Sequence, residues 1–123
     1  MTDAPLSVPI EGVWQLESYS RGGVSTSVTG VLFLTSGQWS TLYFVPQATS
    51  GEYWGSGESG RYTLHGDRLT FHHRYTFQGG ADKPVVTNLD SQVVEECRIE
   101  ASVDQLTVYF PSGSIIRCRR HEK

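Results

Sequence analysis

The segment Gly60–Phe71, with the sequence GRYTLHGDRLTF, predicts a β-hairpin whose register can be tested within the segment itself. The pair Gly66-Asp67 supplies the glycine that a two-residue hairpin turn needs for a positive φ angle. With the turn placed there, large side chains face each other across the two strands: Leu64 with Leu69, and Tyr62 with Phe71. One register thus gives both strands an apolar face, as in a half-buried hairpin.

The rest of the chain repeats this pattern. From Glu11 onward, short runs of β-branched and aromatic residues alternate with turn residues, and helical periodicity is absent. We expect eight strands, near residues 13–20, 28–35, 38–45, 60–65, 68–77, 92–100, 105–110 and 114–120. Ser36-Gly37 and Ser112-Gly113 predict two further tight hairpins. The expected fold is all-β, an eight-stranded antiparallel up-and-down barrel.

Composition narrows the class of protein. A chain of 123 residues suits one domain, and its formal net charge of -3 offers no basic field for nucleic acid. It has neither a membrane-spanning apolar run nor the start of a signal peptide, so we expect a cytoplasmic protein without a membrane partner. Cys97 and Cys118 lack metal or redox spacing and are expected to be buried free thiols.

The two ends of the chain predict how the barrel closes. Trp14, in Gly12-Val13-Trp14, begins the first strand, and three arginines crowd the last one: Arg117, Arg119 and Arg120. First and last strands become neighbours in a closed barrel, so the indole and a guanidinium can stack. The connections expected at the Trp14 end are short, whereas 21–27, 46–59 and 78–91 at the other end are long. We therefore expect Trp14 and Arg119 to form a closed floor and the opposite end to be a mouth.

These features resemble the lipocalin-like (calycin) barrels, especially small bacterial lipocalin-like domains. The G-x-W of Gly12-Val13-Trp14, the late arginines, the eight-strand meander and the segment 60–70 carry the resemblance. It implies an N-terminal segment over residues 1–10 and a single lipocalin-like domain over 11–123. It also implies a cup for a small hydrophobic molecule, which in some bacterial relatives acts as a cofactor-free cyclase or isomerase.

Strand alternation predicts which side chains line the cup. Continuing by twos from Phe71 places His73, Tyr75 and Phe77 inward. A two-residue turn at Ser112-Gly113 would set Arg117 opposite Val108 and Arg119 opposite Leu106, so both arginines would point inward. The predicted ligand-binding residues are Trp39, Tyr43, Trp54, Tyr62, Phe71, His73, Tyr75, Val108 and Arg117.

Glu95 is the candidate partner for these polar groups. It faces inward if Val93, Cys97 and Ile99 do, while the opposite phase encloses Val94, Glu96 and Arg98; we favour the first because it buries more apolar side chain. His73, Glu95 and Arg117 could then act as catalytic residues that orient a carboxylate or enolate and move a proton. Alternatively, Glu95 and Arg117 form a structural ion pair, and His73 bonds a tyrosine.

Two surface features allow two interpretations each. Trp54 and its neighbour Tyr53 lie in a Gly- and Ser-rich connection that forms either an aromatic flap over the mouth or a plug. Placing Trp39 inside leaves an apolar patch outside, made of Phe33, Leu42 and Phe44. That patch predicts a homodimer, unless residues 1–10 or a loop cover it.

No motif indicates a metal or cofactor. The adjacent rings of His72 and His73 point to opposite faces of a strand, and neither a nucleophile elbow nor a phosphate-binding loop occurs. We expect binding of a small, largely hydrophobic organic molecule with an anionic or carbonyl group. The alternatives are a cofactor-free cyclase or isomerase, for example in secondary-metabolite biosynthesis, and an interaction module with a filled barrel.

Overall fold

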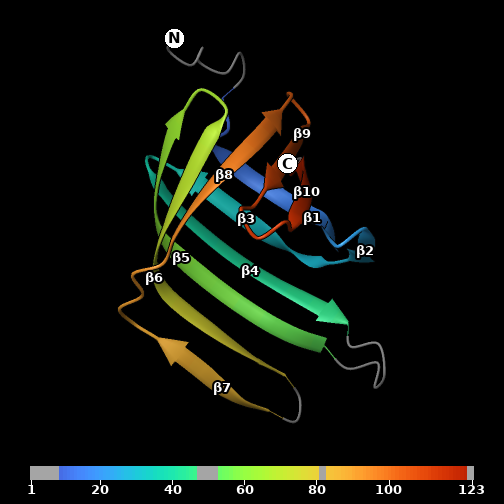
Figure 1. Ribbon diagram of the computed structural model, residues 1–123, viewed down its shortest axis with the longest axis vertical. Helices are drawn as coiled ribbons and strands as arrows, with labels where there is room; N and C mark the ends of the chain where they lie inside the picture. The colour runs from blue at the N-terminus through green and yellow to red at the C-terminus, as the bar shows by residue number, and fades with distance from the viewer. Residues whose placement is uncertain (1–8, 47–52, 81–82, 122–123) are drawn as a thin grey trace.

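The computed structural model describes residues 9–46, 53–80 and 83–121 of the chain (Figure 1). Within these ranges every element of regular structure is a β-strand. The strands are β1 (Gly12–Arg21), β2 (Val24–Ser27), β3 (Thr29–Thr35), β4 (Gln38–Pro46), β5 (Tyr53–His65), β6 (Arg68–Gly80), β7 (Lys83–Asn88), β8 (Val94–Ala101), β9 (Gln105–Tyr109) and β10 (Ile115–Arg120).

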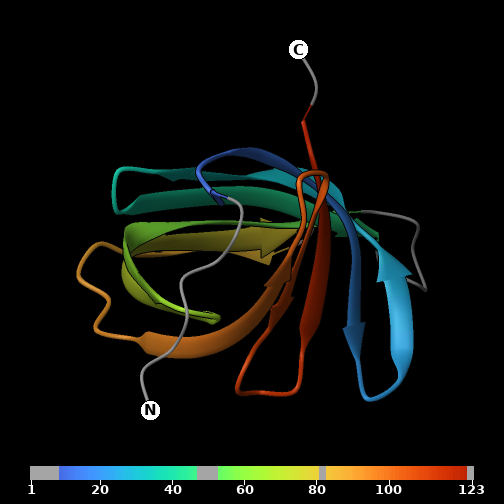
Figure 2. The same cartoon turned by 90° about the horizontal axis from the view of Figure 1, so that it is seen from above.

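Eight of the described strands close into an antiparallel barrel. Their order is β1, β3, β4, β5, β6, β8, β9 and β10, and β10 pairs back onto β1. Figure 2 shows these strands curving round a common interior. β2 pairs with the end of β1, and β7 lies outside the ring beside the distal half of β6 (Figure 1). The predicted eight-stranded up-and-down barrel is confirmed.

Two predicted hairpins have the expected registers. In the β5–β6 hairpin, Leu64 pairs with Leu69 and Tyr62 with Phe71. The β3–β4 hairpin turns at Ser36-Gly37, where both residues have positive φ angles of 49° and 81°. The primed turn geometry matches the twist of the flanking strands, so these local signals fix the register.

The third predicted hairpin is wrong by one residue. β9 and β10 are joined through residues 110–114, and Val108 lies opposite Ile116 rather than Arg117. A shift of one residue moves every side chain of a strand to its other face. Arg117 and Arg119 therefore point outward and are exposed. The prediction that both arginines face the interior is wrong.

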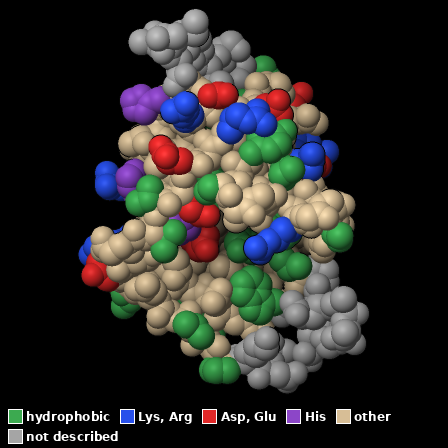
Figure 3. All heavy atoms as spheres, viewed as in Figure 1, with side chains coloured by type: hydrophobic (Ala, Val, Ile, Leu, Met, Phe, Trp, Pro, Cys, Tyr) green, Lys and Arg blue, Asp and Glu red, His purple; other side chains and the backbone are tan. Residues whose placement is uncertain are grey.

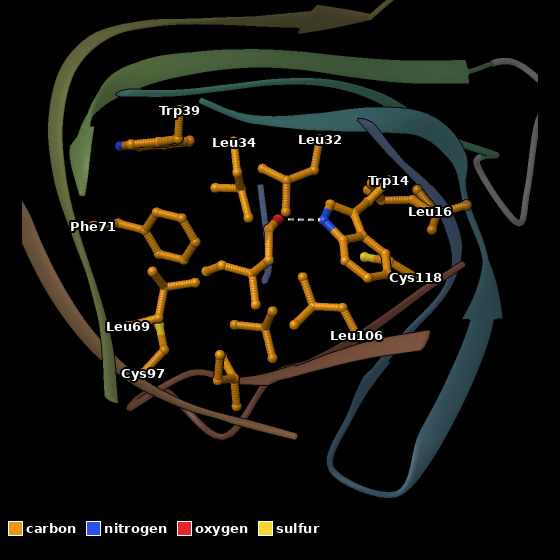
Figure 4. Close-up of a cluster of buried hydrophobic side chains, with 14 residues drawn as sticks. Trp14, Leu16, Leu32, Leu34, Trp39, Leu69, Phe71, Cys97, Leu106 and Cys118 are labelled. Atoms are coloured by element: carbon orange, nitrogen blue, oxygen red, sulfur yellow. Dashed lines mark hydrogen bonds between the residues drawn. The ribbon is translucent and has the colours of Figure 1, made fainter. Parts of the chain in front are cut away.

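The barrel floor is built around Trp14, whose side chain is fully buried. Its indole Nε1 donates a hydrogen bond of 2.8 Å to the Ile10 carbonyl oxygen (Figure 4). The guanidinium carbon of Arg120 lies 4.2 Å from the centroid of the indole ring. A Cβ on Gly12, which has a φ of +132°, would lie 2.9 Å from Arg120 Nη1. The absence of a side chain at Gly12 makes room for this guanidinium.

Arg120, and not Arg119, is thus the arginine that covers the floor. Its three guanidinium nitrogens donate to the carbonyl oxygens of Val103, Glu11 and Pro9 at 2.8, 2.9 and 2.8 Å. Arg119 instead lies on the outer surface, 3.5 Å from Glu17 in an exposed ion pair. The predicted stacking of a late arginine on Trp14 occurs, but the assignment to Arg119 is wrong.

The half of the barrel nearest the floor is packed with apolar side chains. Figure 4 shows them pointing inward from opposite walls of the barrel. The fully buried ones are Trp14, Leu34, Leu69, Ile99, Leu106, Val108 and Cys118. Cys97 and Cys118 are both free and buried, and burial raises the pKa of each thiol to about 12.

The connections expected to be long loops are largely strands. Residues 24–27 form β2, residues 53–59 belong to β5, and residues 83–88 form β7. The glycines that suggested a loop in β5 accommodate aromatic rings instead: a Cβ on Gly57 would lie 2.2 Å from Phe77 Cε1. Trp54 accordingly lies in a paired strand, and the prediction that it forms part of a loop is wrong. The expected flap or plug at residues 47–52 lies outside the described residues.

In the described part of the chain there is no helix with the length and apolar character needed to cross a membrane.

Candidate functional site

A cavity of about 160 Å³ occupies the half of the barrel away from Trp14. Apolar and aromatic side chains make up most of its wall, and a few polar groups interrupt them. It is lined by Leu16, Tyr19, Leu32, Trp39, Thr41, Tyr43, Glu58, Phe71, Glu95, Val108, Phe110, Ser112, Ser114 and Ile116. The described barrel is therefore packed at one end and hollow at the other.

Three aromatic rings make the rigid base of this cavity. Trp39 lies edge-on to Phe71, with ring centroids 4.8 Å apart, and Phe71 stacks with Phe110 at 6.1 Å. Such contacts stabilise the ring positions beyond simple burial. A ligand at this base would meet a preformed aromatic surface.

His73 and Glu95 form the most closely bonded polar pair at the cavity. β8 pairs with β6 so that Glu95 lies opposite Phe71 and shares its inward face. His73 Nε2 lies 2.6 Å from Glu95 Oε1, and the His73 ring packs edge-on against Trp39 at 4.9 Å. His73 itself does not line the cavity, so Glu95 is the member of the pair that a ligand would touch.

Of the four residues of the sixth predicted strand that we expected to face inward, three do so. Glu95 lines the cavity, and Cys97 and Ile99 are buried. Val93 directly precedes β8 and is 55% exposed, although its carbonyl oxygen accepts a hydrogen bond of 2.9 Å from the His73 backbone N–H. The prediction that Val93 faces inward is wrong.

Glu58 is a second carboxyl group in the cavity, at a position that the strand pattern of the sequence does not predict. It lies between Thr41 on β4 and Thr76 on β6, on the inward face of β5. Burial raises the pKa of Glu58 above its ordinary value; nearby His73 lowers it and the charge of Glu95 raises it. Part of the Glu58 population is therefore protonated at a pH where a carboxyl group in water is ionised.

Hydroxyl groups line the cavity nearer the mouth. The Tyr19 hydroxyl lies 3.0 Å from Ser114 Oγ, and Ser112 Oγ donates to Ser114 Oγ at 3.3 Å. Tyr43 lies on another wall, where burial and then the charge of Glu58 raise the pKa of its phenol. The phenol of Tyr43 therefore remains neutral, and the hydroxyl groups of both tyrosines can donate and accept hydrogen bonds.

The other predicted ligand-binding residues divide into two groups. Trp39, Tyr43, Phe71 and Val108 line the cavity, as expected. Tyr62, Trp54, Tyr75 and Arg117 do not. Tyr62 packs against the core near the Ser36-Gly37 turn, and Trp54 lies beside Tyr43, with ring centroids 6.5 Å apart.

Tyr75 points outward because of a bulge in β6. Ser59 pairs with Tyr75 and Gly60 with His73, so Arg74 is the extra residue on β6. A bulge reverses the alternation beyond it, which leaves Tyr75 50% exposed. A Cβ on Gly60 would lie 1.8 Å from the His72 carbonyl oxygen, so the bulge requires glycine there. The predictions that Tyr75 lines the cup and that Phe77 faces inward are both wrong, since Phe77 is 46% exposed.

The outer surface carries the apolar patch expected from strands 28–35 and 38–45. Phe33, Leu42 and Phe44 are 44, 40 and 41% exposed.

On the face shown in Figure 3, acidic and histidine side chains lie together near the centre with hydrophobic ones beside them, and the basic side chains are scattered.

Within the described ranges, no group of three or more His, Cys, Asp or Glu side chains could hold a metal ion. Comparison with known protein families gives no match to any family model, and comparison with curated proteins finds no relative. The assignment of function consequently depends on the site itself.

Proposed function

We propose that this protein is a lipocalin-like barrel that binds a small, largely apolar organic molecule in its cavity. The observation that carries the proposal is the 160 Å³ cavity with aromatic walls and a few convergent polar groups. An apolar cavity of about 150 Å³ holds benzene in another protein. The enclosed part of the ligand is therefore about the size of one ring, and longer ligands would extend through the mouth.

The polar groups narrow the chemistry of the ligand. The tyrosine hydroxyls can donate to a carbonyl group, and the carboxylates can accept from a donor. The expectation of an anionic group depended on Arg117, which lies outside the barrel. We therefore retain the carbonyl group, drop the anionic group, and add a hydrogen-bond donor as a second polar feature that the carboxyl groups of the cavity can accept.

The test fills the cavity without touching its polar groups. Ile116 lines the cavity and the next residue, Arg117, is exposed, so Ile116→Trp and Arg117→Trp form a matched pair on β10. We expect saturable binding of benzyl alcohol in calorimetry or ligand-observed NMR, lost in Ile116→Trp and retained in Arg117→Trp. Equal binding by both variants, or none by the wild type up to ~20 mM, contradicts the proposal.

A second candidate is a cofactor-free cyclase or isomerase with the same cavity. The contact of 2.6 Å between His73 and Glu95 favours it, because this pair can hold a proton beside an apolar substrate. Glu95 would take a proton from a carbon next to a carbonyl group, and the same proton or a solvent proton would return to the product.

Acetophenone in deuterium oxide tests this second candidate. NMR would follow exchange of its methyl protons, which an acid-base site accelerates. We expect Glu95→Gln to abolish the acceleration and Glu96→Gln, on the exposed face of the same strand, to preserve it. Exchange at the rate seen in buffer would refute the acid-base role.

A further inference from the structure

The charged side chains that line the cavity are all acidic. Among its described lining residues the charged ones are Glu58 and Glu95, and no described Lys or Arg lines it. Glu95 already has a partner in His73 at 2.6 Å, whereas Glu58 lies at the cavity wall without a hydrogen bond to another described side chain. Glu58 is therefore the carboxyl group available to a ligand.

The aromatic rings around these carboxyl groups also favour a positively charged ligand. Tyr19, Tyr43, Trp39 and Phe110 present aromatic groups to the same cavity. The face of an aromatic ring attracts a cation, and the attraction grows when water is excluded. Carboxylate and aromatic groups on one wall thus favour the same kind of ligand, an organic cation with an apolar body.

We propose that the cavity selects a protonated amine carried on an apolar body of about one ring. This inference deepens the proposed function and depends on it. The ammonium group would lie at Glu58, and the ring would pack on Trp39 and Phe71.

The half-buried position of Glu58 explains why an amine should bind more tightly than an alcohol of the same shape. The half-buried Glu58 carboxylate has lost part of its hydration, and no hydrogen bond from another described side chain replaces it. Nearby His73 compensates in part, and a ligand with a positive charge adds the stabilisation that is still lacking. A hydroxyl group donates one hydrogen bond and leaves the charge uncompensated. A carboxylate ligand would repel both Glu58 and Glu95.

A bare metal ion fits the cavity less well than an amine. Hard cations require six or more oxygen ligands, and the described residues hold no group of three metal-ligating side chains. The surrounding wall is apolar and aromatic, which favours an organic body around the charge.

The experiment compares three single-ring probes by calorimetry near neutral pH: benzylamine, benzyl alcohol and benzoate. They share a ring and differ in the charge of the attached group. We expect benzylamine to bind about tenfold tighter than benzyl alcohol, since a hydrogen bond to a charged group contributes more than a neutral one. Benzoate should bind weakest.

Two variants locate the effect. Glu58→Gln keeps the shape of the side chain and removes its charge, and should weaken benzylamine about tenfold and benzyl alcohol much less, because a neutral amide oxygen can still accept the hydroxyl hydrogen bond. Glu96→Gln, exposed on β8, is the control and should leave both affinities unchanged. Thermal melting checks that both variants are folded, and the ranking of probes by the wild type does not depend on either variant.

The outcomes separate the two proposals. Equal affinities for the three probes, tightest binding of benzoate, or unchanged benzylamine binding by folded Glu58→Gln would overturn the selection of an amine and leave the cavity as a binding site. Failure of all three probes to bind the wild type would overturn the proposed function itself.

Discussion

Replacing Arg120 with alanine should destabilise the barrel more than replacing any other late arginine. The guanidinium joins three parts of the chain that are far apart in sequence: it donates to Pro9 and Glu11 before β1, and to Val103 before β9. It also covers the Trp14 ring at 4.2 Å. Arg120→Ala removes all of these contacts and exposes one face of a buried indole.

The magnitude follows from the contacts. Three hydrogen bonds from a partly exposed charged donor contribute about 1 kcal/mol each at most, and stacking on an aromatic ring about 0.5–1 kcal/mol. The carbonyl oxygens that lose their donor lie at the surface and can bond water, so no large penalty for unpaired groups is added. We expect a loss of about 3 kcal/mol in the free energy of unfolding.

Urea denaturation followed by tryptophan fluorescence measures this loss. With a slope of roughly 1.5 kcal/mol per molar urea, the midpoint should fall by about 2 M. Arg119→Ala is the matched control, because its ion pair with Glu17 spans 3.5 Å between exposed side chains and contributes at most ~0.5 kcal/mol. Arg120→Lys keeps the positive charge but lacks the planar set of guanidinium donors, so its urea midpoint should lie between those of the two alanine variants.

Equal midpoints for Arg120→Ala and Arg119→Ala would refute the reasoning. That result would mean that Trp14 is held by the surrounding core alone and that the guanidinium adds nothing measurable. A slope that changes together with the midpoint would indicate a different unfolding transition and would call for a second probe of unfolding.

Three further predictions follow from the same structure. Burial raises the pKa of the Cys97 and Cys118 thiols to about 12, so Ellman's reagent should label neither thiol in the native protein and both after unfolding; rapid native labelling would contradict this. Burial also raises the pKa of Glu58, so the folded state binds its proton more tightly and stability from this group is lost as pH rises through the raised pKa. Glu58→Gln should therefore gain stability over the wild type in thermal melts as pH rises from acid to neutral, and a difference independent of pH would contradict it. The outer patch predicts a homodimer in sedimentation velocity and a monomer for Phe33→Ser/Phe44→Ser, so a monomeric wild type would refute it.

The parts of the fold that were predictable from sequence are those with local causes. Gly66-Asp67 and Ser36-Gly37 fix tight turns, and alternation then decides which face of each adjoining strand is apolar. The hairpin register alone predicts that Phe71 faces the interior, where it lines the cavity. Predictions from alternation are wrong where an irregularity exchanges the inward and outward side chains of a strand, at the bulge beside Arg74 and in the turn over residues 110–114.

Glu58 shows why the candidate site was only half predictable. Around it, polar side chains point inward and glycines point outward, which is the reverse of the usual strand pattern. The outward glycines are explained by aromatic rings that cross them, such as Phe77 over Gly57. Those rings belong to other strands, so no signal within residues 53–59 identifies the segment as β-structure.

The sequence by itself determined an all-β chain, its eight-stranded meander and the buried indole at one end, because turn chemistry and hydrophobic alternation act over a few residues. Tertiary structure decided which arginine covers Trp14 and which carboxyl groups enter the cavity. Those outcomes depend on the register between strands, and a slip of one residue exchanges inside for outside without changing the local pattern. The acidic character of the cavity is therefore a property of the closed barrel rather than of any one segment.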